Sequence, residues 1–192
     1  MLILASQSPR RREMFDRLGL SYRAMTSDAD ETITEALSPA DYVKTLALRK
    51  AYALTASPDD FVVAADTVVA LDGEIYGKPA DYADAFRMIS NFSGKTHEVY
   101  TAFAIVKDGK AYAEADATAV TFRPLTEREI DYYIQKESPY DKAGAYGIQE
   151  LAGIFVEKIE GNFDNVVGLP LCQLESAFKR EFGLSLFAFA KA

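Results

Sequence analysis

Charged residues on a face that the sequence predicts to be buried give the first indication of chemistry. In the first predicted helix, Arg11 lies three and four positions before Met14 and Phe15, so it faces inward with them. A guanidinium beside the free N–H groups at a helix N-terminus forms an anion site, to which the neighbouring Ser6 and Ser8 would add neutral donors. The alternative is that Arg11 only extends past the end of the core.

Lys50 and Asp66 are also placed against the hydrophobic pattern. Lys50 falls inside the apolar stripe of a helix expected from Ser38-Pro39 to about Ala56, and an unpaired charge there would be very costly. A structural ion pair and a ligand-binding role are equally open for it. Asp66 interrupts Phe61 to Leu71, the most apolar run in the chain. A metal ion, a lysine or a shifted pKa must compensate for that carboxylate, and such carboxylates are over-represented at active sites.

Other segments have weaker patterns. Glu31 lies in an acidic stretch that is also compatible with a solvated loop. Ligands gather at strand ends in α/β sheets, so Asp66, Thr67 and the Gly77-Lys78-Pro79 loop are candidates for the edge of a cleft. The glycine-rich run from Asp141 to Gln149 would let the backbone approach a ligand closely, or would form an ordinary turn.

Absent motifs narrow the chemistry. With one histidine, His97, and one cysteine, Cys172, the chain has no Cys/His zinc cluster, so a metal would be held by oxygen atoms, which favours Mg²⁺ or Mn²⁺. Ser93-Gly94-Lys95-Thr96 ends like a P-loop, but Ile89 stands where the first glycine is needed. Without a motif around it, His97 is expected to be structural.

The predicted elements have a mixed α/β order. Strands are expected at 2–5, 22–25, 61–71, 99–106, 111–122, 154–159 and 165–167, and helices at 9–19, 39–56, 82–92, 126–135 and 170–182. Helices would cover a mixed, twisted, partly antiparallel sheet. Because no repeat or linker interrupts the 192 residues, we expect a single domain spanning 1–192.

Composition limits the partners. The formal charge of −8 repels nucleic acids, so we expect no nucleic-acid partner, whereas a phosphorylated small molecule can still bind where a few basic residues and a cation are concentrated in one cleft. No stretch approaches the ~20 apolar residues that span a bilayer, and the first residues lack the order of a secretory signal. We therefore expect a cytoplasmic protein without a membrane partner.

Five motifs, in order and spacing, resemble those of the Maf family. They are SQSPRR at 6–11, ADTVV at 65–69, GKP at 77–79, DKAGAYGIQ at 141–149 and VGLP at 167–170. The resemblance implies a fold similar to the inosine triphosphate pyrophosphatases, an elongated two-lobed molecule around a central cleft. Members are often dimers, so a homodimer is among the expected assemblies.

The resemblance also implies an activity, the hydrolysis of a nucleoside triphosphate to the monophosphate and pyrophosphate with a divalent cation. Asp66 matches the family's proton acceptor, and Glu31 matches a carboxylate that holds the metal together with it. Arg11, Lys50 and Lys78 match the positive groups that bind the phosphates. Members of the family have also been linked to septum formation, so a nucleotide-binding regulator without turnover is the alternative.

The same motifs imply a substrate. Arg11, Thr67 and Gln149 are similar to the branch that acts on dTTP, UTP and some modified pyrimidines, whereas a sister branch prefers 7-methyl-GTP. Arg10, in the same motif as Arg11, is expected among the substrate-binding residues. Glu150 stands where the family pattern has glycine, and this carboxylate would either alter the base pocket or face water.

Overall fold

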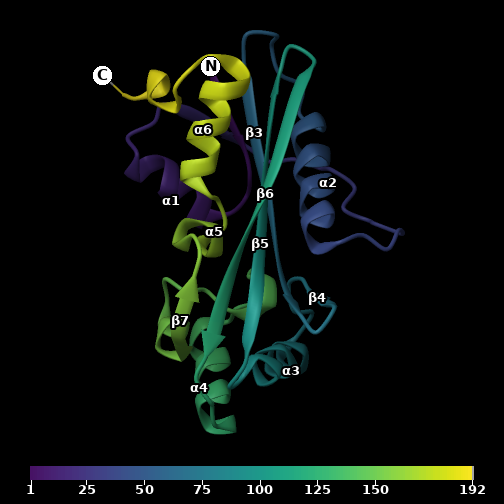
Figure 1. Cartoon of the computed structure of the whole chain (residues 1–192), viewed down its shortest axis with the longest axis vertical. Coiled ribbons are helices and arrows are strands. Elements are labelled where there is room, and N and C mark those ends of the chain that lie inside the picture. The colour runs from purple at the N-terminus through teal and green to yellow at the C-terminus, as the bar shows by residue number, and fades with distance from the viewer. Residues whose placement is uncertain (192) are drawn as a thin grey trace. The chain divides into compact units, whose positions relative to one another are not determined.

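The protein has a mixed α/β fold built on a seven-stranded sheet. The computed structural model describes residues 1–191, and within them the strand order is β2-β1-β3-β5-β6-β7, with β4 paired to β3 (Figure 1). The strands are β1 (Leu2–Ala5), β2 (Tyr22–Met25), β3 (Phe61–Leu71), β4 (Glu74–Tyr76), β5 (Thr96–Lys107), β6 (Lys110–Phe122) and β7 (Val156–Glu160). The mixed sheet agrees with the sequence prediction.

Helices flank the strands. They are α1 (Pro9–Arg17), α2 (Pro39–Tyr52), α3 (Tyr82–Phe92), α4 (Glu127–Glu137), α5 (Phe163–Val167) and α6 (Leu171–Phe182), with 3-10 helices η1 (Ala143–Ala145), η2 (Leu151–Phe155) and η3 (Leu186–Phe189). Within the described residues, the longest of these is 14 residues, and none has the length and apolar character needed to cross a membrane.

The chain divides into two compact units, which share the long strands β3, β5 and β6. Unit 1 contains Met1–Asp66, Thr101–Asp116 and the chain from Gly168 onward. Unit 2 contains Thr67–Tyr100 and Ala117–Val167.

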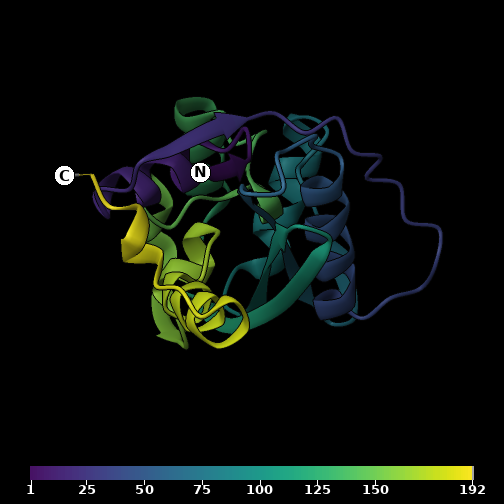
Figure 2. The same ribbon diagram turned by 90° about the horizontal axis from the view of Figure 1, so that it is seen from above.

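Unit 1 is organised around strand β1. This strand is completely buried and pairs in parallel with both β2 and β3, so that Leu2 is opposite Tyr22 on one side and Phe61 on the other. The β2–α2 connection is a long irregular loop (Figure 2). The Phe61 ring packs against Phe178 of α6 at 5.5 Å between centroids, which ties the C-terminal helix to β3.

Unit 2 is built around an aromatic cluster. Phe92 of α3 stacks on His97 at 4.4 Å between centroids and meets the edges of Tyr76, Phe122 and Tyr146. Helices α3 and α4 pack together, and α4 begins with a capping box formed by Thr126. In this unit residues 68–71 of β3 are buried, as is the face of β6 that carries Phe122.

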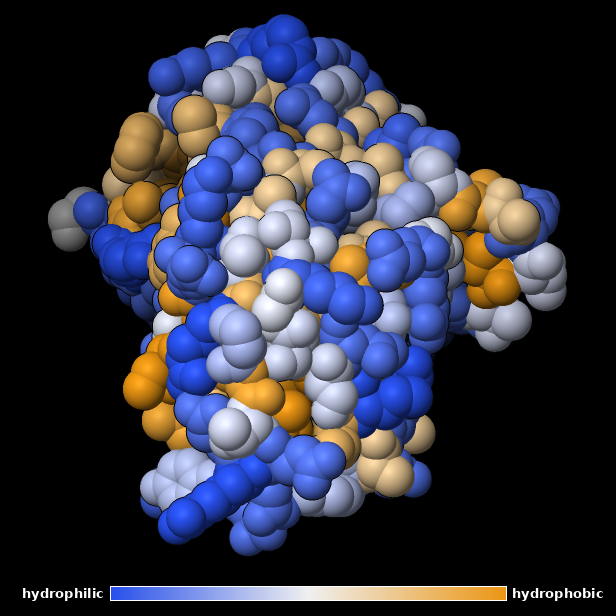
Figure 3. Space-filling model, turned by 60° about the horizontal axis from the view of Figure 1, so that its bottom comes forward, coloured by the Kyte–Doolittle hydropathy of each residue, from blue (hydrophilic) through white to orange (hydrophobic). Residues whose placement is uncertain are grey.

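Exposed apolar residues are interspersed with polar ones. The large exposed apolar side chains are Met1, Tyr52, Tyr82, Tyr132, Tyr140, Leu151, Ile154, Phe163 and Phe187. On the face drawn in Figure 3, hydrophobic residues lie in small groups between hydrophilic ones. Exposed apolar residues scattered in this way are ordinary on folded proteins.

Most predicted elements are confirmed, two predictions are corrected and one strand was missed. The strand predicted at 165–167 is wrong, because this segment is helix α5, whose first turn is held by the Asn162 side chain accepting from Asp164 N at 2.9 Å. Helix α2 ends at Tyr52 rather than Ala56, with Ala53 as its C-cap, whose N–H donates to Arg49 O at 3.0 Å. The short strand β4 was missed, although Asp72 and Gly73 have the positive φ angles of a hairpin turn, 52° and 83°.

Candidate active site

Asp66 forms the centre of the candidate site in unit 1. It lies on β3, is 8% exposed, and its Oδ1 accepts a hydrogen bond from Lys50 Nζ at 2.5 Å. Burial raises the pKa of Asp66 above its usual range, while the charges of Lys50 and Arg11 act in the opposite direction. The carboxylate that interrupts the apolar strand is therefore compensated by a lysine, one of the possibilities left open by the sequence.

Lys50 reaches Asp66 because of its place on α2. The buried face of this helix contains Val43, Leu46, Ala47 and Ala51, and Lys50 follows the same stripe in the last turn. A cation is favourable at that end of the helix because of the helix dipole. The Lys50 side chain is only 16% exposed, so its charge is held near the carboxylate instead of in open solvent.

Glu31 supplies the second carboxylate, from the β2–α2 loop. Its Oε2 lies 3.2 Å from Lys50 Nζ, although the side chain is 56% exposed. Arg49 fixes the loop on both sides of Glu31, since its Nη1 donates to the carbonyl oxygens of Asp30 at 3.2 Å and Thr32 at 2.7 Å. Sequence reasoning missed this role of Arg49, because a contact to backbone carbonyls leaves no periodic pattern.

Arg11 faces inward, as predicted. Its Nε donates to Gly168 O at 2.7 Å, and its Nη1 lies 3.5 Å from Ser6 Oγ. Burial lowers the pKa of Arg11 to about 10, with Asp66 opposing the shift, so the guanidinium stays charged at neutral pH. Arg10 is half-buried and near enough that its charge also lowers the pKa of Arg11.

The start of α1 leaves donors near this guanidinium. Ser6 Oγ accepts from Ser8 N at 3.1 Å, which orders the turn before the helix. Within residues 1–191, the Ser8 hydroxyl does not cap α1. The hydroxyl of Ser8, at the positive end of the helix dipole, is therefore not engaged in capping and suits an anion.

The two carboxylates converge on one cationic position, which tests the fit of a metal. Glu31 and Asp66 both place an oxygen within 3.2 Å of the same ammonium, that of Lys50. Within residues 1–191 no group of three or more His, Cys, Asp or Glu side chains could hold a metal. One or two carboxylates completed by phosphate oxygens and water are the usual ligands of Mg²⁺ in nucleotide enzymes, so the donor set fits.

The remaining predicted residues belong to unit 2. Thr67 is half-buried on β3, while Lys78 and Gln149 are exposed in loops. Gly144 N donates to Gly77 O at 2.9 Å, which joins the loop of Lys78 to the segment of Gln149. Unit 2 thus brings together the motifs at 77–79 and 141–149.

Close packing explains a glycine in that segment. Gly144 has a φ of 65°, and a Cβ at this position would lie 2.6 Å from Cγ2 of Val69. Only glycine accepts both the backbone conformation and the contact with β3.

Known proteins identify the family. A family model described as Maf-like protein matches residues 1–181. The chain belongs to the Maf family. Proteins with the name dTTP/UTP pyrophosphatase from Bacillus thuringiensis subsp. konkukian and from Bacillus cereus are 45% and 46% identical to it over 180 residues, 93% of this chain and 94% of each relative. A crystal structure of a nucleoside-triphosphatase / dITP/XTP pyrophosphatase from Mycobacterium abscessus is 15% identical, covers 65% of this chain and 75% of its own, and has a TM-score of 0.40, too low to bear on the fold.

One cluster in the Maf motifs was missed by sequence reasoning. Lys142 is buried in unit 2, with its Nζ 2.9 Å from Asp141 Oδ1 and 3.2 Å from Glu150 Oε2. The departure from glycine at Glu150 was the only signal. Its carboxylate is half-buried and paired with a motif lysine, so it does not simply face water.

His97 is structural in its contacts, as expected. Its Nε2 lies 2.8 Å from the Tyr146 hydroxyl, and the ring packs between Phe92 and Phe122. Burial lowers the pKa of His97 to about 3, so the ring is neutral at physiological pH. This neutral pair fixes Tyr146, within the Maf motif at 141–149, to strand β5.

Proposed function

We propose that this chain hydrolyses nucleoside triphosphates in the cytoplasm, dTTP and UTP foremost, to the monophosphate and pyrophosphate. The observation that carries the proposal is the buried Asp66, paired with Lys50 and Glu31 and near Arg11. These groups lie in the family's motif positions, in a chain 45% identical to a protein with the name dTTP/UTP pyrophosphatase.

The chemistry begins with water. Asp66 orients a water molecule for attack on the α phosphorus and accepts its proton, a role for which a raised pKa is favourable. The new P–O bond forms as the bond from the α phosphorus to the bridging oxygen breaks, and pyrophosphate leaves with the bonding electrons. We propose that Glu31 and Asp66 hold Mg²⁺ or Mn²⁺, which when bound neutralises phosphate charge.

Basic groups bind the triphosphate. Arg11, Lys50 and Lys78 bind phosphate oxygens and stabilise the charge that develops on the leaving group. The helix N-terminus at Ser8 adds neutral donors, with Ser6 beside it. Arg10 extends the same positive surface.

Three residues are proposed to determine which nucleotide base the site prefers. Thr67 and Gln149, together with Arg11, are proposed to select pyrimidines, including modified pyrimidines. The pairing of Glu150 with Lys142 places an additional charged group beside Gln149 in the sequence, which makes position 150 a candidate for fine specificity.

A substrate panel tests this proposal. Purified protein is incubated with dTTP, UTP, CTP, modified pyrimidine triphosphates and 7-methyl-GTP, each with Mg²⁺, Mn²⁺ or a chelator, and the products are separated by ion-exchange chromatography. We expect monophosphate and pyrophosphate in equal amounts, fastest from dTTP and UTP and lost with the chelator. Release of orthophosphate would show that another bond is cut, and tight binding without products would identify a regulator instead of an enzyme.

A further inference from the structure

The loop that carries Lys78 is attached at both of its ends. It connects β4 to α3, and within residues 1–191 the exposed side chain of Lys78 has no hydrogen bond or ion pair. In contrast to this exposed side chain, the residues on either side of the loop position, Tyr76 and Pro79, are buried. On a fixed backbone, a free ammonium that meets an anion loses side-chain rotamer freedom but little backbone entropy.

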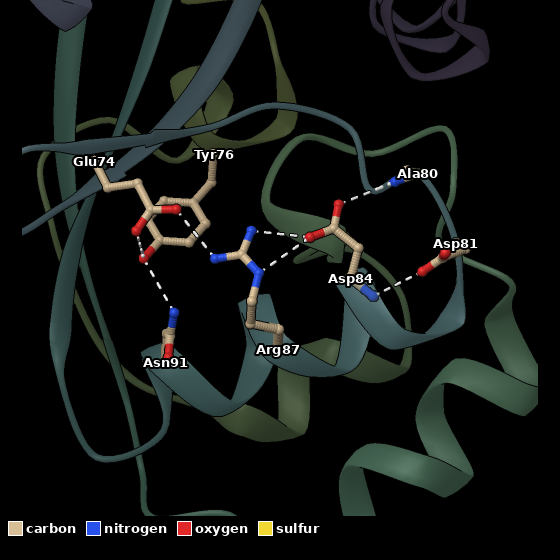
Figure 4. Close-up of polar contacts among 7 residues, drawn as sticks. All are labelled: Glu74, Tyr76, Ala80, Asp81, Asp84, Arg87 and Asn91. Atoms are coloured by element: carbon tan, nitrogen blue, oxygen red, sulfur yellow. Dashed lines mark hydrogen bonds and ion pairs between the residues drawn. The ribbon is translucent and has the colours of Figure 1, made fainter.

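The start of the loop is held through Tyr76. The Tyr76 hydroxyl donates to Glu74 Oε2 at 2.9 Å and accepts from Asn91 Nδ2 of α3 at 3.2 Å (Figure 4). One residue later, Gly77 O accepts from Gly144 N at 2.9 Å. These bonds fix the chain immediately before Lys78.

The end of the loop is held through Asp84. Ala80 N donates to Asp84 Oδ2 at 3.0 Å, and Asp84 N donates in turn to Asp81 Oδ1 at 2.9 Å, the N-cap of α3 (Figure 4). The backbone two residues after Lys78 therefore depends on the position of one carboxylate.

Arg87 joins the two ends. Its Nη1 donates to Glu74 Oε1 at 3.0 Å, while Nε and Nη2 donate to Asp84 Oδ1 at 3.2 and 2.9 Å. Figure 4 shows the guanidinium between the two carboxylates, and it also lies 5.6 Å from the centre of the Tyr76 ring. The hydrogen bonds that Arg87 donates to Asp84 and then to Glu74 raise the pKa of Arg87, so the bridge is charged at every physiological pH.

We propose that Arg87 is a positioning residue for Lys78, an inference that rests on the proposed function. Arg87 is 48% exposed, and exposed ion pairs contribute little to global stability. Its planar fork instead sets the distance between the carboxylate that holds Tyr76 and the one that holds Ala80. Losing it frees the loop, and the Lys78 ammonium then meets the triphosphate with a larger entropic cost.

A double-mutant cycle on steady-state kinetics tests this role. For Arg87→Gln we expect KM for dTTP to rise about threefold to tenfold with kcat changed less than about twofold, since binding geometry is lost and the reacting groups are intact. In the Lys78→Ala background the same substitution should change KM by less than about twofold. Arg87→Lys should recover only part of the loss, because one ammonium cannot make the paired contacts.

The matched control is Arg180→Gln. Arg180 is 52% exposed and also bridges two carboxylates, those of Glu114 and Glu181, but it lies in unit 1 on α6. Its substitution should leave KM unchanged. Equal KM effects for both arginines, or an Arg87 effect of the same size with and without Lys78, would overturn the positioning role.

Hydrogen exchange gives a readout that does not require turnover. The Ala80 amide should exchange at least about tenfold faster in Arg87→Gln than in wild type, with no such change in Arg180→Gln. An unchanged rate would contradict the proposal even if the kinetics agreed. If no triphosphate is hydrolysed by wild type, the proposed function fails, and the cycle is then run on dTTP affinity by calorimetry.

Discussion

Each unit of the molecule holds a lysine between two carboxylates, but the burial is reversed. In unit 1 the Asp66 side chain is 12% exposed, the Lys50 side chain is 16% exposed, and the Glu31 side chain is 56% exposed. In unit 2 the lysine is the most buried group, with Lys142 8% exposed, while its partners Asp141 and Glu150 are 52% and 31% exposed.

This reversal indicates different roles for the two clusters, a chemical role for the one around Asp66 and a packing role for the one around Lys142. Burial raises the pKa of Asp66, and buried carboxylates with shifted pKa values are over-represented at active sites. Lys142 instead packs on backbone, since a Cβ on Gly147 would lie 3.1 Å from Lys142 Cε and 2.9 Å from Glu150 Oε2. Substitution of Asp66 or Lys50 should therefore affect turnover, and substitution of Lys142 should affect stability.

The largest effect is expected at Asp66. Asp66→Asn keeps the shape of the side chain and removes the proton acceptor, so kcat should fall about 10² to 10⁴-fold, the usual contribution of general base catalysis. Thermal unfolding should show a folded protein, because the loss of a buried charge also removes its desolvation cost. Asp59→Asn, at an exposed position, is the control. Wild-type turnover in Asp66→Asn would refute the catalytic role.

The second largest effect is expected for Lys50→Met, which should also shift the pH dependence of kcat/KM. The Lys50 charge lowers the pKa of Asp66, so without it the pKa rises further. Because the ionised carboxylate is the active form, kcat/KM should fall at a higher pH than in wild type as the solution is acidified, in addition to a loss of about 10 to 100-fold at neutral pH. Lys44→Met on the same helix, which breaks an exposed pair with Asp41, should change neither quantity. If kcat/KM of Lys50→Met fell at the same acidic pH as that of wild type, the result would show that the Lys50 charge does not influence the pKa of Asp66.

Lys142→Met should destabilise unit 2. Removing the lysine leaves carboxylates beside a buried space, and we expect a loss of about 1 to 3 kcal/mol in the free energy of unfolding by urea titration. Lys158→Met breaks a pair with Glu160 that is exposed on both sides, and should cost less than about 0.5 kcal/mol. Equal free energies of unfolding for Lys142→Met and Lys158→Met would contradict the packing role of Lys142.

The smallest effect is a pH dependence of stability from His97. Its pKa is about 3 in the folded state against 6.5 for the free side chain, so the unfolded state takes up a proton that the folded state does not. The stabilisation is complete above pH 6.5 and is lost as the pH falls toward 3. Between pH 7 and 5.5, wild type should lose about 1 kcal/mol more than His97→Gln. If the free energy of unfolding had the same pH dependence in wild type and His97→Gln, the pKa of His97 would be the same in the folded and unfolded states.

Periodicity explains what the sequence could reveal. Arg11, Lys50 and Asp66 stand out because helix and strand periods predict an apolar residue at each position, and all three converge in unit 1. Family membership, confirmed by the family model, came from ordered motifs. The role of Glu31 in the site was predicted only from the resemblance, since a loop has no periodic pattern. Arg49 holds this loop through hydrogen bonds to backbone carbonyls.

Contacts between distant segments account for what was missed. The bridge at Arg87 joins a three-residue strand to a helix, and both the strand and its pairing depend on a turn of two residues. Asn165, in the helix that replaces the predicted strand, donates to Val99 O and Thr118 Oγ1, contacts 66 and 47 residues away along the chain. No local pattern encodes such partners.

The central claim is that the charges of unit 1 direct water to the α phosphorus. Hydrolysis of dTTP in water enriched with ¹⁸O, followed by mass spectrometry of both products, tests it directly. The account predicts one ¹⁸O atom in the nucleoside monophosphate and none in the pyrophosphate, with Asp66→Asn forming both products at least about 10²-fold more slowly. Label in the pyrophosphate, or in free orthophosphate, would contradict it.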